Sequence, residues 1–131
     1  MSGAWNRVEG FQALADWYGG TPGFHDGEML SLTIDFPGEA VFQVSGWRTT
    51  NRVDEQGYFE HEKHFVAVFR LEGLSLIDLE SDYEGGTGII GSLGVIEAGE
   101  GIELQIFSVL GVGGRIRARG ASITFAPGKP A

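Results

Sequence analysis

The chain contains no cysteine, only four prolines and only nine basic residues among its 131 positions. Without cysteine it has no disulfide, no thiol nucleophile and no thiolate ligand for a metal. It also lacks an apolar run near the ~20 residues that cross a membrane as a helix. Residues 1–11 show no basic region followed by an apolar stretch, so we expect no secretory signal and a cytoplasmic location.

The few basic residues stand against 18 acidic ones, which gives a formal net charge of −9. This charge repels phosphate groups, so we expect neither nucleic acid nor an anionic membrane surface as a partner. Residues 115–131 are the exception, because they hold four basic groups and no acidic one. The acid surplus has two interpretations: solubility with internal ion pairing, or an acidic surface that docks a basic protein.

Glycine is abundant, with 22 residues that follow no fixed period. Apolar residues at helical spacing, bounded by glycines, predict a helix over residues 6–19. Alternating apolar residues then predict β-structure over residues 28–126, and residues 127–131 are expected to be a disordered tail. We therefore predict a single domain over residues 1–131. Its fold class is mainly β: a single antiparallel, strongly curled sheet or partial barrel of about seven strands, with one N-terminal α-helix.

Turn signals divide the predicted sheet into short strands. The polar residues 51–62 are the longest loop candidate, and glycines predict turns at residues 72–73 and 98–101. The alternation slips at residues 76–77, which indicates a bulge. The glycines of residues 111–114 precede the last strands.

Known catalytic motifs are not supported. Residues 86–91 match the glycine pattern of a dinucleotide-binding loop, but strand-like alternation follows where that motif needs a helix. The chain has no nucleophile elbow, no zinc-protease helix and no phosphate-binding P-loop. We therefore expect a binding protein rather than an enzyme.

A histidine and two carboxylates lie together in the segment Phe24-His25-Asp26-Gly27-Glu28. His25, Asp26 and Glu28 are candidates for binding a divalent metal or for acid–base chemistry. The structural alternative is that the polar side chains satisfy loop backbone groups while Phe24 fills the junction between helix and sheet.

Two further histidines, His61 and His64, flank Glu62 and Lys63. Side chains three apart face opposite sides of a strand, so this pair alone does not predict chelation. If the fold brought them to His25, a metal site using His25, Asp26, His61 and His64 would result. A metal-binding module or metal-dependent enzyme is therefore an alternative function, with a divalent metal as its cofactor.

Trp47 lies out of phase with the apolar residues of its predicted strand, so it is expected to face outward. The acidic loop over residues 54–62 follows and contains Tyr58 and Glu60. An exposed tryptophan beside such a loop is typical of a protein-binding hot spot, which makes these three residues candidate partner contacts. The alternative is that Trp47 covers the second face of the sheet.

Three arginines, Arg115, Arg117 and Arg119, alternate along a predicted strand and would share one face. They could bind phosphates or the carboxylates of a partner. The alternative is cross-strand pairing with an acid of this chain such as Glu103.

The string Phe24-His25-Asp26-Gly27-Glu28, which follows Trp17 and runs into an alternating strand, resembles the immunity-protein-50-like group of small bacterial proteins. The resemblance implies a mostly β cytoplasmic protein with an N-terminal helix that neutralises a toxin by binding it. The group's motif would map onto Phe24, His25, Asp26 and Glu28. A third hypothesis is a homo-oligomeric structural protein that pairs through an open sheet edge.

Overall fold

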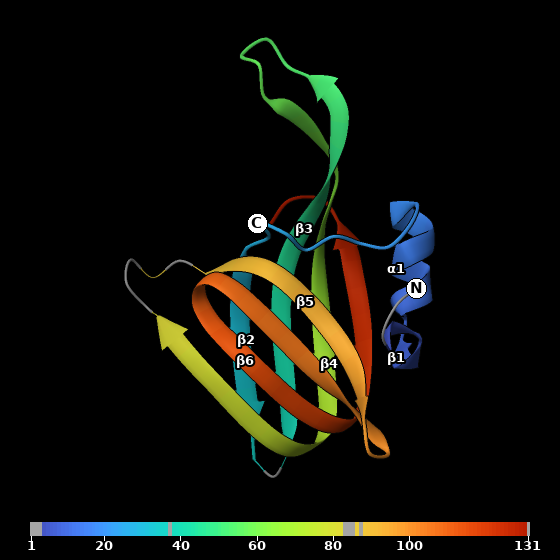
Figure 1. The fold of residues 1–131 in the computed structure, drawn as a ribbon. Helices are drawn as coiled ribbons and strands as arrows, with labels where there is room; N and C mark the ends of the chain where they lie inside the picture. The colour runs from blue at the N-terminus through green and yellow to red at the C-terminus, as the bar shows by residue number, and fades with distance from the viewer. Residues whose placement is uncertain (1–3, 37, 83–85, 87, 131) are drawn as a thin grey trace.

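Strands make up most of the chain, as the alternating apolar residues predict. The computed structural model describes residues 4–36, 38–82, 86 and 88–130. In chain order the elements are a 3-10 helix (Trp5–Arg7), β1 (Val8–Glu9), α1 (Phe11–Tyr18), β2 (Met29–Asp35), β3 (Glu39–Val53), β4 (Phe59–Asp82), β5 (Ile89–Ala98) and β6 (Gly101–Pro127). The prediction of a mainly β fold with one α-helix is confirmed for these residues (Figure 1).

The sheet has six strands in the order β1-β6-β4-β3-β2, and β5 also pairs with β6. Its longer strands pair antiparallel, but Val8 and Glu9 of β1 run parallel to Ala121 and Ser122 of β6. The predictions of a purely antiparallel sheet and of seven strands are therefore wrong. The sheet curls without closing: in the described part of the chain, one isolated β-bridge between Glu28 and Ile89 and the backbone hydrogen bonds around it join its two sides.

Two long strands explain the lower count. β4 continues through the turn predicted at residues 72–73 and bends there, because Gly73 has a φ of 69°. The register shift that follows lies between Leu74 and Leu76, close to the predicted bulge. β6 likewise continues through residues 111–114, where it turns back so that its two halves lie together (Figure 1). A β-carbon on Gly101 would lie 2.1 Å from the carbonyl oxygen of Ala118 in the opposite half.

The loop predicted over residues 51–62 is the end of a hairpin. β3 extends to Val53 and β4 begins at Phe59, so only residues 54–58 form the turn. The carboxylate of Asp54 closes this turn by accepting hydrogen bonds from the N–H groups of Gln56 and Tyr58, at 2.9 and 3.0 Å. The hairpin projects well beyond the rest of the sheet (Figure 1).

The N-terminal helix is shorter than the predicted 6–19. The 3-10 turn and β1 come first, and α1 starts only after Gly10, whose φ is 89°. A β-carbon on Gly10 would lie 2.2 Å from the carbonyl oxygen of Ile123, so glycine allows the chain to run against β6. The sequence pattern could not show this contact, because it joins residues far apart in the chain.

The core lies between α1 and the curled sheet. It contains an aromatic group in which Phe24 stacks within 6.1 Å of Trp5 and lies 5.8 and 5.9 Å from Phe65 and Phe69 (ring centroids). Phe24 is thus a packing residue that anchors the segment carrying His25. At the other end of the chain, Pro127 still pairs with Phe65 as part of β6, in the segment predicted as a tail.

Candidate functional site

The Phe24–Glu28 segment is a tight turn held against β3 and β5. The N–H of Gly27 donates to the carbonyl of Phe24 at 2.9 Å, and the N–H of Ile90 donates to the carbonyl of Gly27 at 2.9 Å. Ser45 is buried and ties down Glu28, because its hydroxyl accepts from the N–H of Glu28 at 3.1 Å. A β-carbon on Gly27 would lie 2.2 Å from the carbonyl oxygen of Ser45, so this turn requires glycine.

The turn leaves His25 and Asp26 exposed and next to each other. The Nδ1 atom of His25 lies 3.0 Å from the carbonyl oxygen of Gly91. Its Nε2 atom lies 3.5 Å from Oδ2 of Asp26. Asp26 has a φ of 64°, which asparagine, aspartate and glycine tolerate best. The backbone therefore fixes the direction of both polar side chains, while solvent still reaches them.

Several predicted residues meet in one cleft of about 280 Å³. His25 and Asp26 line it together with Trp47 and His61, which come from β3 and β4. The other lining residues are Tyr18, Gly23 and Thr49. The predicted contacts Tyr58 and Glu60 lie farther along the hairpin and do not line this cleft.

His61 and His64 are closer together than strand alternation predicts. Lys63 has a φ of 54°, which breaks the alternation between them. Both rings reach Trp47: His61 stacks on it with a centroid distance of 5.2 Å, and His64 lies at 5.9 Å. Burial lowers the pKa of His64 below its ordinary value of 6.5, and the nearby Lys129 and His61 lower it further. Burial therefore favours the neutral form of His64, whose ring packs beside Trp47.

The predicted metal ligands do not form a cluster among the described residues. His25, Asp26 and His61 share the cleft, but the described residues contain no group of three or more histidine or acidic side chains arranged to hold a metal. The metal site therefore stays a prediction.

Two of the three predicted arginines of β6, Arg115 and Arg117, pair within the chain. Glu103 is only 3% exposed, and its carboxylate accepts hydrogen bonds from Nε of Arg117 and Nε2 of Gln105, both at 2.8 Å. Arg115 lies 3.7 Å from Glu103 and 3.3 Å from Asp78. The hydrogen bond from Arg117 is the main reason that the pKa of Glu103 falls below its ordinary value, and Gln105 contributes next. Internal pairing is therefore the interpretation that fits Arg115 and Arg117.

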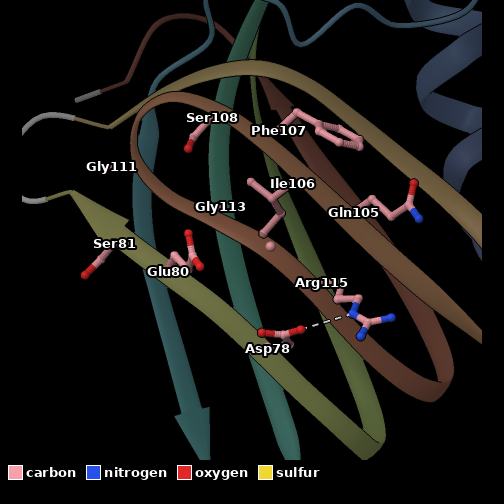
Figure 2. A pocket seen from close by; sticks show the side chains of 11 residues that line it. Asp78, Glu80, Ser81, Gln105, Ile106, Phe107, Ser108, Gly111, Gly113 and Arg115 are labelled. Carbon is pink, nitrogen blue, oxygen red and sulfur yellow. Dashed lines mark hydrogen bonds and ion pairs between the residues drawn. The ribbon is translucent and has the colours of Figure 1, made fainter.

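A second hollow, the trough, lies between β4 and β6 and has a volume of about 520 Å³ (Figure 2). Three glycines of β6 give it a floor without side chains: Gly111, Gly113 and Gly114. The other lining residues are Asp78, Glu80, Ser81, Gln105, Ile106, Phe107, Ser108 and Arg115. Sequence reasoning missed this hollow; the run of glycines at 111–114 was its only local signal.

The end of the hairpin exposes apolar side chains. Val53, Tyr58 and Phe59 are 54%, 72% and 58% exposed. Glu60 and Glu62 pair with Arg52 along the shaft, at 3.3 and 3.9 Å. The end of the hairpin therefore combines exposed apolar side chains with the acidic Asp54 and Glu55 of its turn, and ion pairs line the strands behind it.

Comparisons with known proteins identify no relative. No family model matches the chain, and no curated protein or solved structure matches it either. The resemblance to the immunity-protein-50-like group therefore stays a prediction. In the part of the chain that the structure describes, no helix has the length and apolar character to cross a membrane.

Proposed function

We propose that this chain is a non-catalytic, cytosolic protein-binding domain whose interface is the β3–β4 hairpin together with the cleft at its base. One observation carries the proposal: Val53, Tyr58 and Phe59 are more than half exposed at the end of a hairpin that projects from the sheet (Figure 1). Aromatic side chains that lose water on binding supply much of the energy of protein interfaces. Trp47 and His61 extend this surface toward His25 and Asp26.

Charge complementarity favours a basic partner. At least six of the nine basic residues form ion pairs within the chain, so much of the positive charge is already matched. They are Arg7, Arg48, Arg52, Arg70, Arg115 and Arg117. The acid surplus speeds the approach of a positively charged protein. A toxin neutralised by binding is the specific case that the Phe24–Glu28 segment suggests.

The test compares wild type with a Tyr58→Ser/Phe59→Ser double variant as bait for proteins of the source cell. The matched control is Phe36→Ser, because Phe36 is an exposed aromatic of the β2–β3 turn, away from the hairpin. We expect one basic protein to bind wild type and Phe36→Ser, and to dissociate at high salt. Once that protein is purified, the double variant should bind it at least about thirtyfold more weakly in calorimetry, as hot-spot losses of ~2 kcal/mol imply.

Two results would contradict the proposal. The first is that no protein is retained by wild type under any growth condition tested. The second is that a retained protein binds the double variant as tightly as it binds wild type. A His25→Ala/Asp26→Ala double variant, measured against the same partner, then tells whether the cleft belongs to the interface.

A further inference from the structure

β2 is an open edge of the sheet. Among the described residues it pairs only with β3, and residues 30–34 make no backbone hydrogen bond on the side away from β3. An open edge is a template for another strand, and proteins usually protect it with charged residues or proline. Residues 30–34 read Leu-Ser-Leu-Thr-Ile and include neither. The middle of β2 is therefore an unprotected edge.

The core-facing side chains of this edge are incompletely covered. Leu32 pairs with Phe42 and Ile34 pairs with Ala40, and residues paired directly across two strands share one face of the sheet. Phe42 and Ala40 are 1% and 0% exposed, whereas Leu32 and Ile34 are only partly buried. A further strand beside β2 would cover these two side chains and satisfy the free backbone groups of the edge.

The other open edge of the sheet carries charge. Beyond Leu74, β4 pairs only with β6 in the described part of the chain, and this stretch bears the exposed carboxylates of Asp78 and Glu80. Two copies of such an edge would bring like charges together, which opposes their pairing. β2 is therefore the edge that suits pairing with a copy of itself.

The sequence of β2 is complementary to itself in the antiparallel direction. If Leu32 lies opposite Leu32 of a second copy, the other residues fall into three matched pairs: Leu30 with Ile34, Ser31 with Thr33 and Met29 with Asp35. Apolar side chains then meet on the core-facing side, hydroxyls meet on the outer side, and no two charges stand opposite each other. A two-fold axis through Leu32 makes this contact self-complementary, as a symmetric dimer requires.

An exposed ring and an apolar hollow lie at opposite ends of β2. Phe36 directly follows the strand and is 91% exposed. A hollow of about 140 Å³ lies beside the beginning of the strand, and its lining includes Met29, Leu32, Phe42, Gly88, Gly111 and Val112. That volume is close to the ~150 Å³ of an apolar cavity that binds benzene. In the antiparallel register, Phe36 of each copy comes to the end of β2 where the hollow of the other copy lies.

We propose that two copies of this chain form a symmetric dimer in which their β2 strands pair antiparallel. Leu32 lies on the two-fold axis, and Phe36 of each copy enters the hollow beside Met29 of the other. A further hollow of about 230 Å³, between Ile34 and residues 74–77 of β4, leaves room at the opposite end for the incoming strand. The contact uses residues 29–36 and leaves the β3–β4 hairpin uncovered.

The first test uses the lack of cysteine in the chain. Leu32→Cys should form a disulfide-linked dimer with oxidised glutathione, because residues directly opposite in an antiparallel pair have α-carbons about 4.5–5.5 Å apart, within the reach of a disulfide. The matched control is Ser31→Cys, which is more exposed but lies diagonally from its copy, at about 7–8 Å. The control should cross-link at least about tenfold more slowly, since that separation is beyond a disulfide.

Sedimentation equilibrium of the full chain measures the dimer without a cross-link. We expect a dissociation constant between about 1 µM and 1 mM at high salt. The dimer should weaken as the salt is lowered, because each copy carries a net charge of −9 and salt screens their repulsion. A basic protein on the hairpin has the opposite salt dependence, so the two proposals can fail separately.

Variants then locate the contact. Ser31→Glu/Thr33→Glu should weaken the dimer at least about tenfold, because two pairs of glutamates would stand directly opposite each other. The control Ser92→Glu/Thr124→Glu adds the same charge at exposed residues of β5 and β6 and should dimerise at least about tenfold more tightly than the β2 variant. Phe36→Ser should also weaken the dimer, whereas Tyr58→Ser/Phe59→Ser should dimerise as wild type does.

The proposal is overturned if wild type stays monomeric at high salt up to about 1 mM. It is also overturned if Ser31→Cys cross-links as fast as Leu32→Cys, or if the glutamate variants of β2 and of β5 and β6 dimerise equally. None of these results bears on the hairpin, whose aromatic residues are tested with a basic partner.

Discussion

At the scale of single residues, Glu103 stands out among the described acidic side chains, because half-exposed arginines cover it almost completely. Its carboxylate is buried between Arg117 and Gln105, and their hydrogen bonds favour the ionised form. A carboxylate whose pKa is lowered by folding stabilises the protein above its ordinary pKa of 4.5. That contribution is lost as the pH falls through the lowered value in the folded state.

Glu103→Gln therefore gives a prediction with a defined pH dependence. At neutral pH the variant should lose about 1–3 kcal/mol of the free energy of unfolding, because Arg117 loses a charged partner. Below pH 4.5 the gap to wild type should narrow, since the unfolded wild-type chain then binds a proton at Glu103, and it should close once the pH falls through the lowered pKa of the folded state. Urea unfolding at a series of pH values measures both effects. Glu100→Gln, on the exposed turn before β6, is the control, and a gap that does not change with pH would contradict the argument.

Only part of the cleft around His25 could be predicted from the sequence. The proximity of His25 and Asp26 follows from their order in the chain. Strand phase likewise places Trp47 on the face opposite Phe42 and Val44, but its ring is half-buried there against His61 and His64. The meeting of these residues with His61 does not follow from the sequence, because it depends on the β3–β4 register and on the positive φ of Lys63. The trough could not be predicted from the sequence. The lack of a side chain at Gly113 indicates a hollow only when Glu80 is known to lie opposite it, and that pairing depends on the β4–β6 register.

At the scale of elements, a strand can either end or only bend at a glycine. Which of the two happens depends on the contacts that the glycine makes with residues far away in the chain. The turn predicted at residues 98–101 is confirmed, because Ala98 pairs with Gly101 across it. No described atom of a distant residue lies within 4 Å of a β-carbon at Gly99, so the chain is free to reverse there. At Gly73 the same residue type only bends β4. The strand continues past Gly73 and stays paired with β6. Arg119 packs so closely there that a β-carbon on Gly73 would lie 2.9 Å from the β-carbon of Arg119.

Two glycines of β6 test this distinction directly. Gly101→Ala should cost about 1–3 kcal/mol of unfolding free energy, because the new β-carbon would overlap the carbonyl oxygen of Ala118. Gly120→Ala should change stability little or raise it by up to ~1 kcal/mol, since nothing lies within 4 Å of that position. Chemical denaturation of the two variants side by side measures the difference. Equal changes in unfolding free energy for the two variants would contradict the close approach of Gly101 to Ala118 between the two halves of β6.

At the scale of the whole molecule, β4 and β6 hold the sheet together. β4 lies between β3 and β6, and β6 also pairs with β1 and β5. Every strand except β2 and β3 therefore loses a partner if β6 separates. In the described part of the chain, the hairpin beyond Arg48 and Glu62 pairs through its backbone only within its own two strands, whereas the body of the sheet is paired to further strands.

This difference predicts a gradient of amide hydrogen exchange. Amides of residues 65–72 and 120–126 should exchange slowest, because their strands are paired on both sides or packed on the core and open only with global unfolding. Amides of residues 48–62 should exchange orders of magnitude faster, since local opening of the hairpin exposes them while the core stays folded. Exchange followed by NMR resolves both segments in one sample. Equal protection in the two segments would mean that the hairpin is covered in solution, by a second copy or by its own base, and would move the proposed interface elsewhere.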